Sequence, residues 1–255
     1  MVEKNKVYEM EISSYGSDGE GVGKVDDFVV FVPYTARGDR ILVKILKVAK
    51  HHAFGKLERI LQSSPARVEP SCAVFGKCGG CSIMHLNYEE QLWLKREKVS
   101  GCLRRIGGCQ TPVEPVLGSK NTFHYRNKVQ IPVGRRDGIV AGFYAPHSHR
   151  IVPHESCAIE PETVNAIVSC ILDHMERFSI EPYDEETKNG QMRTIYVRSA
   201  KSGEQMVVLV TRKSDLPGKE LLIENLKGLG VVTLVQNIHP QPTNVVLGKE
   251  YKVLY

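Results

Sequence analysis

Residues 17–32, with the sequence SDGEGVGKVDDFVVFV, decide how the N-terminal part of the chain folds. Positions 17–23 are rich in glycine and acidic turn formers, whereas β-branched and aromatic residues fill the end of the stretch. This composition predicts two short strands, Lys24–Val25 and Phe28–Val32, separated by Asp26 and Asp27. No helical pattern follows the glycines, so a strand turn or bulge explains them better than a phosphate-binding loop does.

The segments on both sides of this stretch continue the all-β pattern. Val7–Ser14, Arg40–Val48 and Phe54–Leu61 are rich in strand formers and lack the period of a helix. Five short strands with glycine turns between them are typical of a small barrel of the oligonucleotide-binding (OB) type. Residues 1–62 are therefore predicted to form a five-stranded, OB-like β-barrel.

A helix with one basic face is predicted for residues 87–106. Asn87 is placed to cap this helix, with Glu90 three residues later, and Gly107 follows its last turn. The basic face consists of Lys95, Arg96, Lys98, Arg104 and Arg105. Ser63–Pro70 is predicted to be a linker and is followed by a cysteine-rich loop, so residues 63–110 form a second region that ends with the helix.

Residues 111–255 alternate between predicted strands and helices. The expected strands are Tyr125–Val133, Ile139–Tyr144, Thr194–Arg198, Gln205–Thr211, Val231–Gln236 and Asn244–Leu247, and the expected helices are Pro161–Phe178 and Leu216–Leu226. This order is typical of a split α/β sandwich, which we expect to form a central domain. The whole chain is thus predicted to be an α+β protein of several domains.

The bulk composition is that of an ordinary globular protein. Of the 255 residues, 42% are hydrophobic and 25% are charged, which predicts a packed core. No apolar run is long enough to span a bilayer, and the N-terminus lacks the apolar segment of a signal peptide. We therefore expect a cytoplasmic protein that does not interact with membranes.

The cysteines carry the strongest chemical signal in the sequence. Cys72, Cys78 and Cys81 lie in SCAVFGKCGGCS, a short loop whose glycines let the backbone bend and direct N–H groups at the sulfurs. An iron–sulfur cluster is usually bound by four cysteines, and Cys157, in a loop before a predicted helix, is the best-placed fourth ligand. The other candidates for this role are Cys102, Cys109 and Cys170. A small zinc site, or no metal site at all, remains open from the spacing alone.

Basic charge is concentrated in two regions of the chain. Residues 37–59 contain seven Lys and Arg against two Asp and Glu, and residues 95–150 contain eleven against three. Basic side chains next to aromatic ones suit single-stranded RNA, although an ordinary solvated surface would look similar. The candidate RNA-binding residues are Lys47, Lys50, Lys56, Tyr125, Arg126, Lys128, Arg135 and Arg136.

Taken in order, these motifs resemble a known family. The glycine-rich barrel, the cysteine loop, FHYRNKVQIPVG, GFYAPHSHRIVPHESCAIEP and QNIHPQPTNVVLG resemble the RNA uracil-5-methyltransferases, and most closely the branch that modifies 23S ribosomal RNA. The resemblance implies that the barrel is an RNA-binding TRAM domain. It also implies a [4Fe–4S] cluster with Cys72, Cys78, Cys81 and Cys157 as ligands. RNA is then the expected partner, 23S rRNA in particular, and DNA is not.

The resemblance also implies a part that this sequence does not match. Family members have a C-terminal domain that binds S-adenosylmethionine and carries a catalytic cysteine in an S-C-N-P motif. None of the seven cysteines lies in such a motif, so we assign no catalytic residue and expect S-adenosylmethionine to bind only to the full-length enzyme. The chain alone is expected to be inactive.

Two other classes of protein are alternatives to this hypothesis. The first is a non-catalytic RNA-binding module with a structural iron–sulfur or zinc site. The second is a fragment of a radical-SAM methylthiotransferase, which needs a C-x3-C-x2-C loop and a cluster iron without a protein ligand. The observed spacing is C-x5-C-x2-C, which disfavours this second class.

Overall fold

A computed structural model describes residues 2–243 and 245–255. The chain forms two compact units. The first comprises Met1–Gly76 and Cys81–Lys120, and the second comprises Lys77–Gly80 and Asn121–Tyr255. Among the described residues, no helix combines the length and the apolar character needed to cross a membrane.

The first unit begins with a closed five-stranded barrel, as the sequence predicts. Its strands follow the order β1-β2-β3-β5-β4 around the barrel. Every second side chain points inward, so that Val30, Ile41 and Ile45 are fully buried. The strands are β1 (Val7–Tyr15), β2 (Gly21–Val25), β3 (Phe28–Val32), β4 (Arg40–Val48) and β5 (His52–Gln62).

Gly21 and Gly23 of the opening stretch are strand residues next to a bulge, whereas Gly19 lies in the turn before β2 with a φ of 87°; a strand turn and bulge were expected here. The pairing of β1 with β2 shifts register between Ile12 and Ser14, opposite Gly23. A Cβ atom on Gly23 would lie 2.1 Å from the Glu11 carbonyl oxygen. Only glycine therefore allows the two strands to approach this closely at the bulge.

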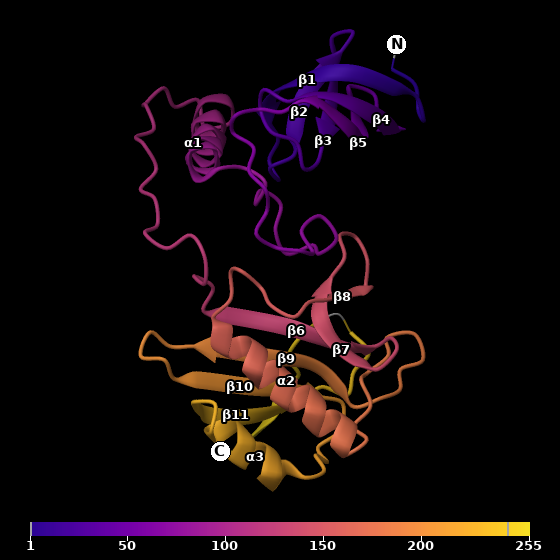
Figure 1. The fold of residues 1–255 in the computed structure, drawn as a ribbon, viewed down its shortest axis with the longest axis vertical. Coiled ribbons are helices and arrows are strands. Elements are labelled where there is room, and N and C mark those ends of the chain that lie inside the picture. The colour runs from indigo at the N-terminus through magenta and orange to yellow at the C-terminus, as the bar shows by residue number, and fades with distance from the viewer. Residues whose placement is uncertain (1, 244) are drawn as a thin grey trace. The chain divides into compact units, whose positions relative to one another are not determined.

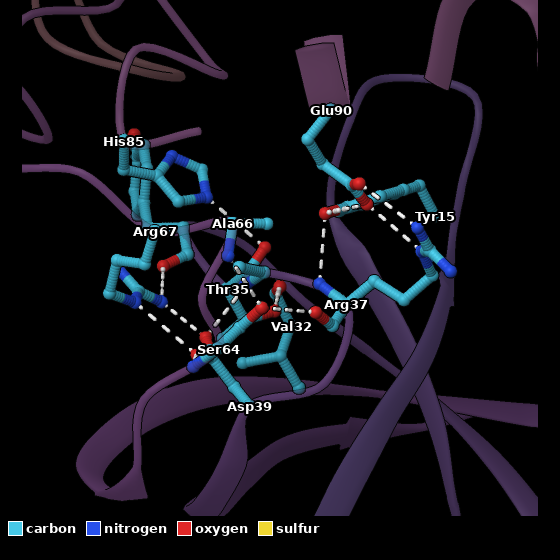
Figure 2. A network of polar contacts seen from close by, with 12 residues as sticks. Tyr15, Val32, Thr35, Arg37, Asp39, Ser64, Ala66, Arg67, His85 and Glu90 are labelled. Atoms are coloured by element: carbon cyan, nitrogen blue, oxygen red, sulfur yellow. Dashed lines mark hydrogen bonds and ion pairs between the residues drawn. The ribbon is translucent and has the colours of Figure 1, made fainter. Parts of the chain in front are cut away.

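Helix α1 (Tyr88–Arg105) is fixed to the barrel by a buried carboxylate (Figure 2). The Asn87 side chain caps the helix by accepting a hydrogen bond of 2.9 Å from the Glu90 backbone N–H. The Glu90 carboxylate, which is almost fully buried, accepts two bonds of 2.9 and 3.0 Å from Arg37. It also accepts a bond of 3.0 Å from the Tyr15 hydroxyl, whose pKa burial raises well above the usual value.

A second buried carboxylate, that of Asp39, holds the segment that follows the barrel. Asp39 accepts hydrogen bonds of 2.7 Å from Ala36 N–H and 2.8 Å from Ser64 N–H, and it forms an ion pair with Arg67 (Figure 2). Arg67 also donates to the Tyr34 carbonyl oxygen at 3.1 Å. Residues 64–67, predicted to be part of a linker, are thus anchored on the barrel by contacts with residues more than twenty positions earlier.

The second unit is a seven-stranded sheet with two helices on one face (Figure 1). Its strand order is β12-β11-β10-β9-β6-β7-β8, and α2 and α3 share one apolar core with it. The elements are β6 (Lys128–Arg135), β7 (Ile139–Tyr144), β8 (Ile151–Pro153), α2 (Glu162–Arg177), β9 (Met192–Ser199), β10 (Gln205–Thr211), α3 (Lys219–Lys227), β11 (Val231–Ile238) and β12 (Glu250–Val253).

Both edges of this sheet differ from the sequence prediction. The short edge strand β8 has no sequence signal, and the strand expected at 244–247 is wrong. Residue 244 lies outside the described residues, and 245–249 form a loop before β12. The Asn237 side chain fixes this loop by accepting from Gly248 N–H at 2.7 Å and donating to the carbonyl oxygens of Gly248 and Glu250.

Acidification is expected to destabilise the second unit through His174 on α2. Burial lowers the pKa of this imidazole below its usual value of 6.5. Its Nε2 lies 2.9 Å from the Pro217 carbonyl oxygen, and its buried Nδ1 has no hydrogen-bond partner among the described residues. The unfolded chain therefore binds the proton more tightly, and stability falls as pH drops below about 6.5.

Hydrogen exchange of the α2 amides at pH 8 and pH 5 checks this prediction. We expect protection to fall at pH 5 in the wild type and to change much less in His174→Phe. His147→Gln, at an exposed position, serves as the matched control and should behave like the wild type. Equal pH sensitivity in wild type and His174→Phe would show that another group is responsible.

Candidate functional site

The four cysteines proposed from the sequence as cluster ligands are all partly buried. Cys72 and Cys81 belong to the first unit, and Cys78 and Cys157 belong to the second. None of them forms a disulfide. Cys102 is exposed on α1, whereas Cys170 packs against the core of the second unit.

In the first unit, aromatic contacts anchor the start of the cysteine loop. The ring of Phe75 packs edge-on against Tyr34, with 5.4 Å between centroids, and lies 5.7 Å from the His85 ring. The Phe75 N–H donates a hydrogen bond of 3.0 Å to the Cys72 carbonyl oxygen, which closes a turn. Cys72 is therefore held at a defined place on the barrel unit.

In the second unit, two glycines shape the loop around Cys78. Gly79 N–H donates to the Tyr144 carbonyl oxygen at 2.9 Å, and a Cβ atom on Gly79 would lie equally close to that oxygen. Gly80 N–H points at Cys78 Sγ, 3.3 Å away. Backbone N–H groups directed at sulfur are what a negatively charged thiolate or cluster requires, so the donor set of this loop fits an iron–sulfur cluster.

Cys157 lies in a turn between β8 and α2, together with two residues to which sequence reasoning gave no role. The ligand atoms of His154, Cys157 and Glu160 all lie within 4.8 Å of one another. Glu160 N–H donates to the Cys157 carbonyl oxygen at 3.1 Å, which folds the turn. The even spacing of these residues, H-x2-C-x2-E, is visible in the sequence. The sequence does not show that the Glu160 side chain is buried.

The environment of Glu160 is electrostatically unusual. Its side chain is buried, and among the described residues the Cys157 thiol alone is placed to hydrogen-bond to its carboxylate. Burial raises the pKa of this carboxyl to about 7, while the Arg126 guanidinium and the Cys157 thiol oppose the rise. Desolvation disfavours the charged carboxylate, so this site favours either a proton or a cation on Glu160.

On the barrel, the predicted RNA-binding lysines lie near an aromatic cluster. Lys47, Lys50 and Lys56 are all exposed. Lys47 is the register partner of Phe54, whose ring contacts those of Phe31 and His52 at 5.7 and 5.0 Å. We call Phe31, His52 and Phe54 the barrel aromatic cluster. No local sequence pattern marks the two phenylalanines, because the pairing of β3 with β5 is what brings them together.

The second set of predicted RNA-binding residues is spread over the second unit. Tyr125 and Arg126 were expected on a strand, but β6 begins only at Lys128. Arg126 N–H instead donates to the Ile159 carbonyl oxygen at 2.9 Å, so this segment follows the turn that contains Glu160. Tyr125 is 59% exposed, which leaves its ring accessible for stacking.

The remaining basic pair lies at the other end of the same strand. Arg135 is the last residue of β6, about 20–25 Å from Lys128 at the usual rise of a strand. Arg135 also forms an ion pair of 2.7 Å with Glu181, whereas Arg136 follows in the β6–β7 turn and is exposed. The structure therefore does not bring these two arginines together with Arg126 and Lys128.

Comparisons with known proteins agree with this architecture. Residues 2–57 match the model of the TRAM domain. A Clostridium tetani protein named "Uncharacterized RNA methyltransferase" is 46% identical over all of this chain, which covers 56% of that protein. A protein of the same description from Halalkalibacterium halodurans is 40% identical over the whole chain, which covers 57% of it. The chain thus spans somewhat more than half the length of these relatives.

A solved structure extends the likeness to three dimensions. The tRNA (uracil-54, C5)-methyltransferase of Pyrococcus abyssi, in complex with S-adenosyl-L-homocysteine, has a TM-score of 0.71 and 25% identity. The match covers 96% of this chain and 55% of that one. The chain therefore contains a TRAM domain, and over its whole length it is similar to RNA methyltransferases.

Proposed function

We propose that this chain is the RNA-binding and iron–sulfur portion of an S-adenosylmethionine-dependent RNA (uracil-5-)-methyltransferase. The observation that carries the proposal is a TRAM barrel with exposed lysines beside an aromatic cluster, in a chain similar throughout to RNA methyltransferases. Lysines attract phosphates, and aromatic rings stack with unpaired bases, so this surface suits single-stranded RNA. In this proposal, S-adenosylmethionine binds only to the full-length enzyme.

The proposed substrate is uracil in 23S rRNA. The uracil-5 chemistry is supported by the Pyrococcus abyssi relative, whose name specifies C5 of a uracil in tRNA. The choice of rRNA rests on the resemblance of the cysteine loop to the branch that modifies 23S rRNA. Binding measurements with rRNA loops and with tRNA side by side distinguish these two substrates.

The proposed cofactor of this portion is a [4Fe–4S] cluster bound by Cys72, Cys78, Cys81 and Cys157. The supporting observations are the contact of Gly80 N–H with Cys78 Sγ and the partial burial of all four cysteines. When bound, such a cluster would link residues far apart in sequence and stabilise the folded chain.

RNA binding to the full chain tests the function directly. We expect a triple variant, Lys47→Ala, Lys50→Ala and Lys56→Ala, to bind single-stranded rRNA loops at least about tenfold more weakly at low salt. Its plot of log affinity against log salt should also be shallower, by about 0.7 for each lost phosphate contact. Phe54→Ala should weaken binding by about 1–3 kcal/mol without changing this slope, because stacking releases no counterions. Fluorescence anisotropy at several salt concentrations measures both quantities.

A second triple variant provides the matched control. Lys188→Ala, Lys201→Ala and Lys219→Ala remove the same charge from exposed positions of the second unit, and we expect wild-type affinity. Equal losses in the two triple variants would mean that net charge alone drives binding, which would refute the barrel surface as the RNA site. Methylation of uracil by this chain alone would refute the proposal that the catalytic part lies elsewhere.

A further inference from the structure

We propose that the groove between the barrel and helix α1 binds single-stranded RNA and extends the RNA-binding surface of the barrel. The groove measures about 620 Å³ and lies entirely within the first unit, with β1, β2 and β3 on one side and α1 on the other. We call it the α1 groove, and its aromatic and basic lining residues are Tyr15, Phe31, Trp93, Lys98, Arg104 and Arg105. The inference rests on the proposed function, because it assigns a second segment of the same RNA to this groove.

A row of side chains across the outside of the barrel leads into the α1 groove. From β4 to β1, the strand pairings align Lys47, Phe54, Phe31, Val22 and Ser14, all of which are at least partly exposed. Neighbouring strands are about 4.8 Å apart, so the row extends over about 19 Å. Phe31 belongs both to the barrel aromatic cluster and to the wall of the groove. A strand of RNA that stacks on this cluster would therefore continue toward α1.

The face of α1 that meets the barrel changes its chemical character along the helix. In the N-terminal half, Glu90 and Leu94 lie on this face and are buried. Lys98, Gly101 and Arg105 continue the same face at spacings of three and four residues, and Lys98 and Arg105 are exposed. A helix face that packs on a neighbouring element is normally apolar along its length. The basic continuation therefore leaves an open groove where apolar side chains would have closed the packing.

Gly101 makes room for the Arg105 guanidinium in the α1 groove. A glycine inside a helix costs about 1 kcal/mol relative to alanine, so its presence in the middle of α1 calls for a reason. A Cβ atom on Gly101 would lie 2.8 Å from Arg105 Nη2. The Arg105 Nε–H donates to the Gly101 carbonyl oxygen at 3.3 Å, and the guanidinium has no carboxylate partner among the described residues. Its two Nη groups are therefore available to a phosphate, which guanidinium binds well.

The charges of the α1 groove complement a phosphate backbone. Its lining contains three cations, Lys98, Arg104 and Arg105, against one carboxylate, that of Glu97, which lies 3.9 Å from Arg104. Lys98 Nζ also donates to the Ser17 carbonyl oxygen at 2.6 Å, which joins α1 to the turn between β1 and β2. Cations beside aromatic rings suit unpaired RNA. An apolar protein segment in the groove would instead bury these cations without countercharges, which is unfavourable.

Quenching of Trp93 fluorescence by RNA tests this inference in the full chain. Trp93 is the only tryptophan and lies in the wall of the α1 groove, so bases that enter the groove should quench it. The probe is an oligouridylate of about twelve nucleotides, within the site sizes of OB-type folds. We expect it to quench Trp93 in the wild type. Combining Arg104→Ala with Arg105→Ala should remove the quenching, weaken binding about tenfold at low salt, and make the plot of log affinity against log salt shallower by about 1.4.

Two further variants control for net charge and for misfolding. Lys95→Ala combined with Lys120→Ala removes the same charge from exposed positions of the first unit outside the α1 groove, and it should bind and quench like the wild type. Gly101→Ala should weaken binding by displacing Arg105, without lowering the melting temperature of the first unit, because alanine favours the helix.

The inference and the proposed function can fail separately. If the double arginine variant kept wild-type affinity and quenching while the triple lysine variant of the barrel lost affinity, the α1 groove would be refuted and the proposed function would stand. If the wild type bound no RNA at all, both would be refuted.

Discussion

Replacing Asp39 with alanine is expected to lower the free energy of unfolding of the first unit by about 3–5 kcal/mol. Its carboxylate is fully buried and binds Ala36 N–H, Ser64 N–H and the Arg67 guanidinium. Removing one partner of a buried ion pair leaves the other charge without compensation, and this accounts for the size of the loss. The substitution also releases residues 64–67 from the barrel.

Denaturant unfolding followed by the fluorescence of Trp93 measures this effect. Trp93 is the only tryptophan in the chain, and it lies on α1, where the Arg37 guanidinium is 3.9 Å from its ring. It therefore reports on the first unit. Asp18→Ala is the matched control, because Asp18 is exposed in the turn before β2. We expect the control to change stability by less than about 0.5 kcal/mol, and a similarly small change in Asp39→Ala would contradict the structural role given to this carboxylate.

Replacing Cys157 with serine is expected to reduce the iron and sulfide content of anaerobically purified protein from about four of each per chain to near zero. A serine hydroxyl is a poor ligand for iron, and the proposed cluster has no other protein ligand at that corner. Metal and sulfide analysis, together with the visible absorption of the cluster, measures the loss. Because the cluster links distant residues, the melting temperature should fall with the iron content.

Two cysteines outside the proposed ligand set serve as controls for this experiment. Cys102→Ser changes an exposed thiol on α1, and Cys170→Ser changes one that packs beside the core of the second unit. Both variants should keep wild-type iron content. If iron were retained in Cys157→Ser but lost in Cys170→Ser, the fourth ligand would be Cys170 and not Cys157. If the wild-type protein contained zinc and no iron, the cysteines would bind zinc and the cluster proposal would be refuted.

The fold of the barrel was predictable because its signals are local. Alternating strand formers and glycine turns specify β1 to β5 within short windows, and each inward residue is buried by the same alternation. The N-terminus of α1 was equally clear, since Asn87 caps Glu90 N–H only three residues away. The cysteine loop was conspicuous for the same reason, with three thiols and three glycines within twelve residues.

The sheet edges and the polar networks were not predictable in this way. The three-residue strand β8 is too short for any periodic pattern, and β12 depends on the Asn237 side chain, eleven or more residues earlier, for the loop that precedes it. The residues around Glu90 do not indicate that Arg37, 53 positions earlier, is its partner. The barrel aromatic cluster likewise exists only because β3 pairs with β5.

The amino-acid sequence by itself determined the β-barrel, the capped basic helix, the α/β character of the remainder and the cysteines that are candidates for metal binding, because each depends on residues close together in the chain. The tertiary structure alone decided that Asp39, Glu90 and Glu160 are buried, which partners Asp39 and Glu90 have, and that the side chains of His154, Cys157 and Glu160 lie close together. Burial and long-range partners depend on which distant segments pack together, and no local pattern of residues encodes that.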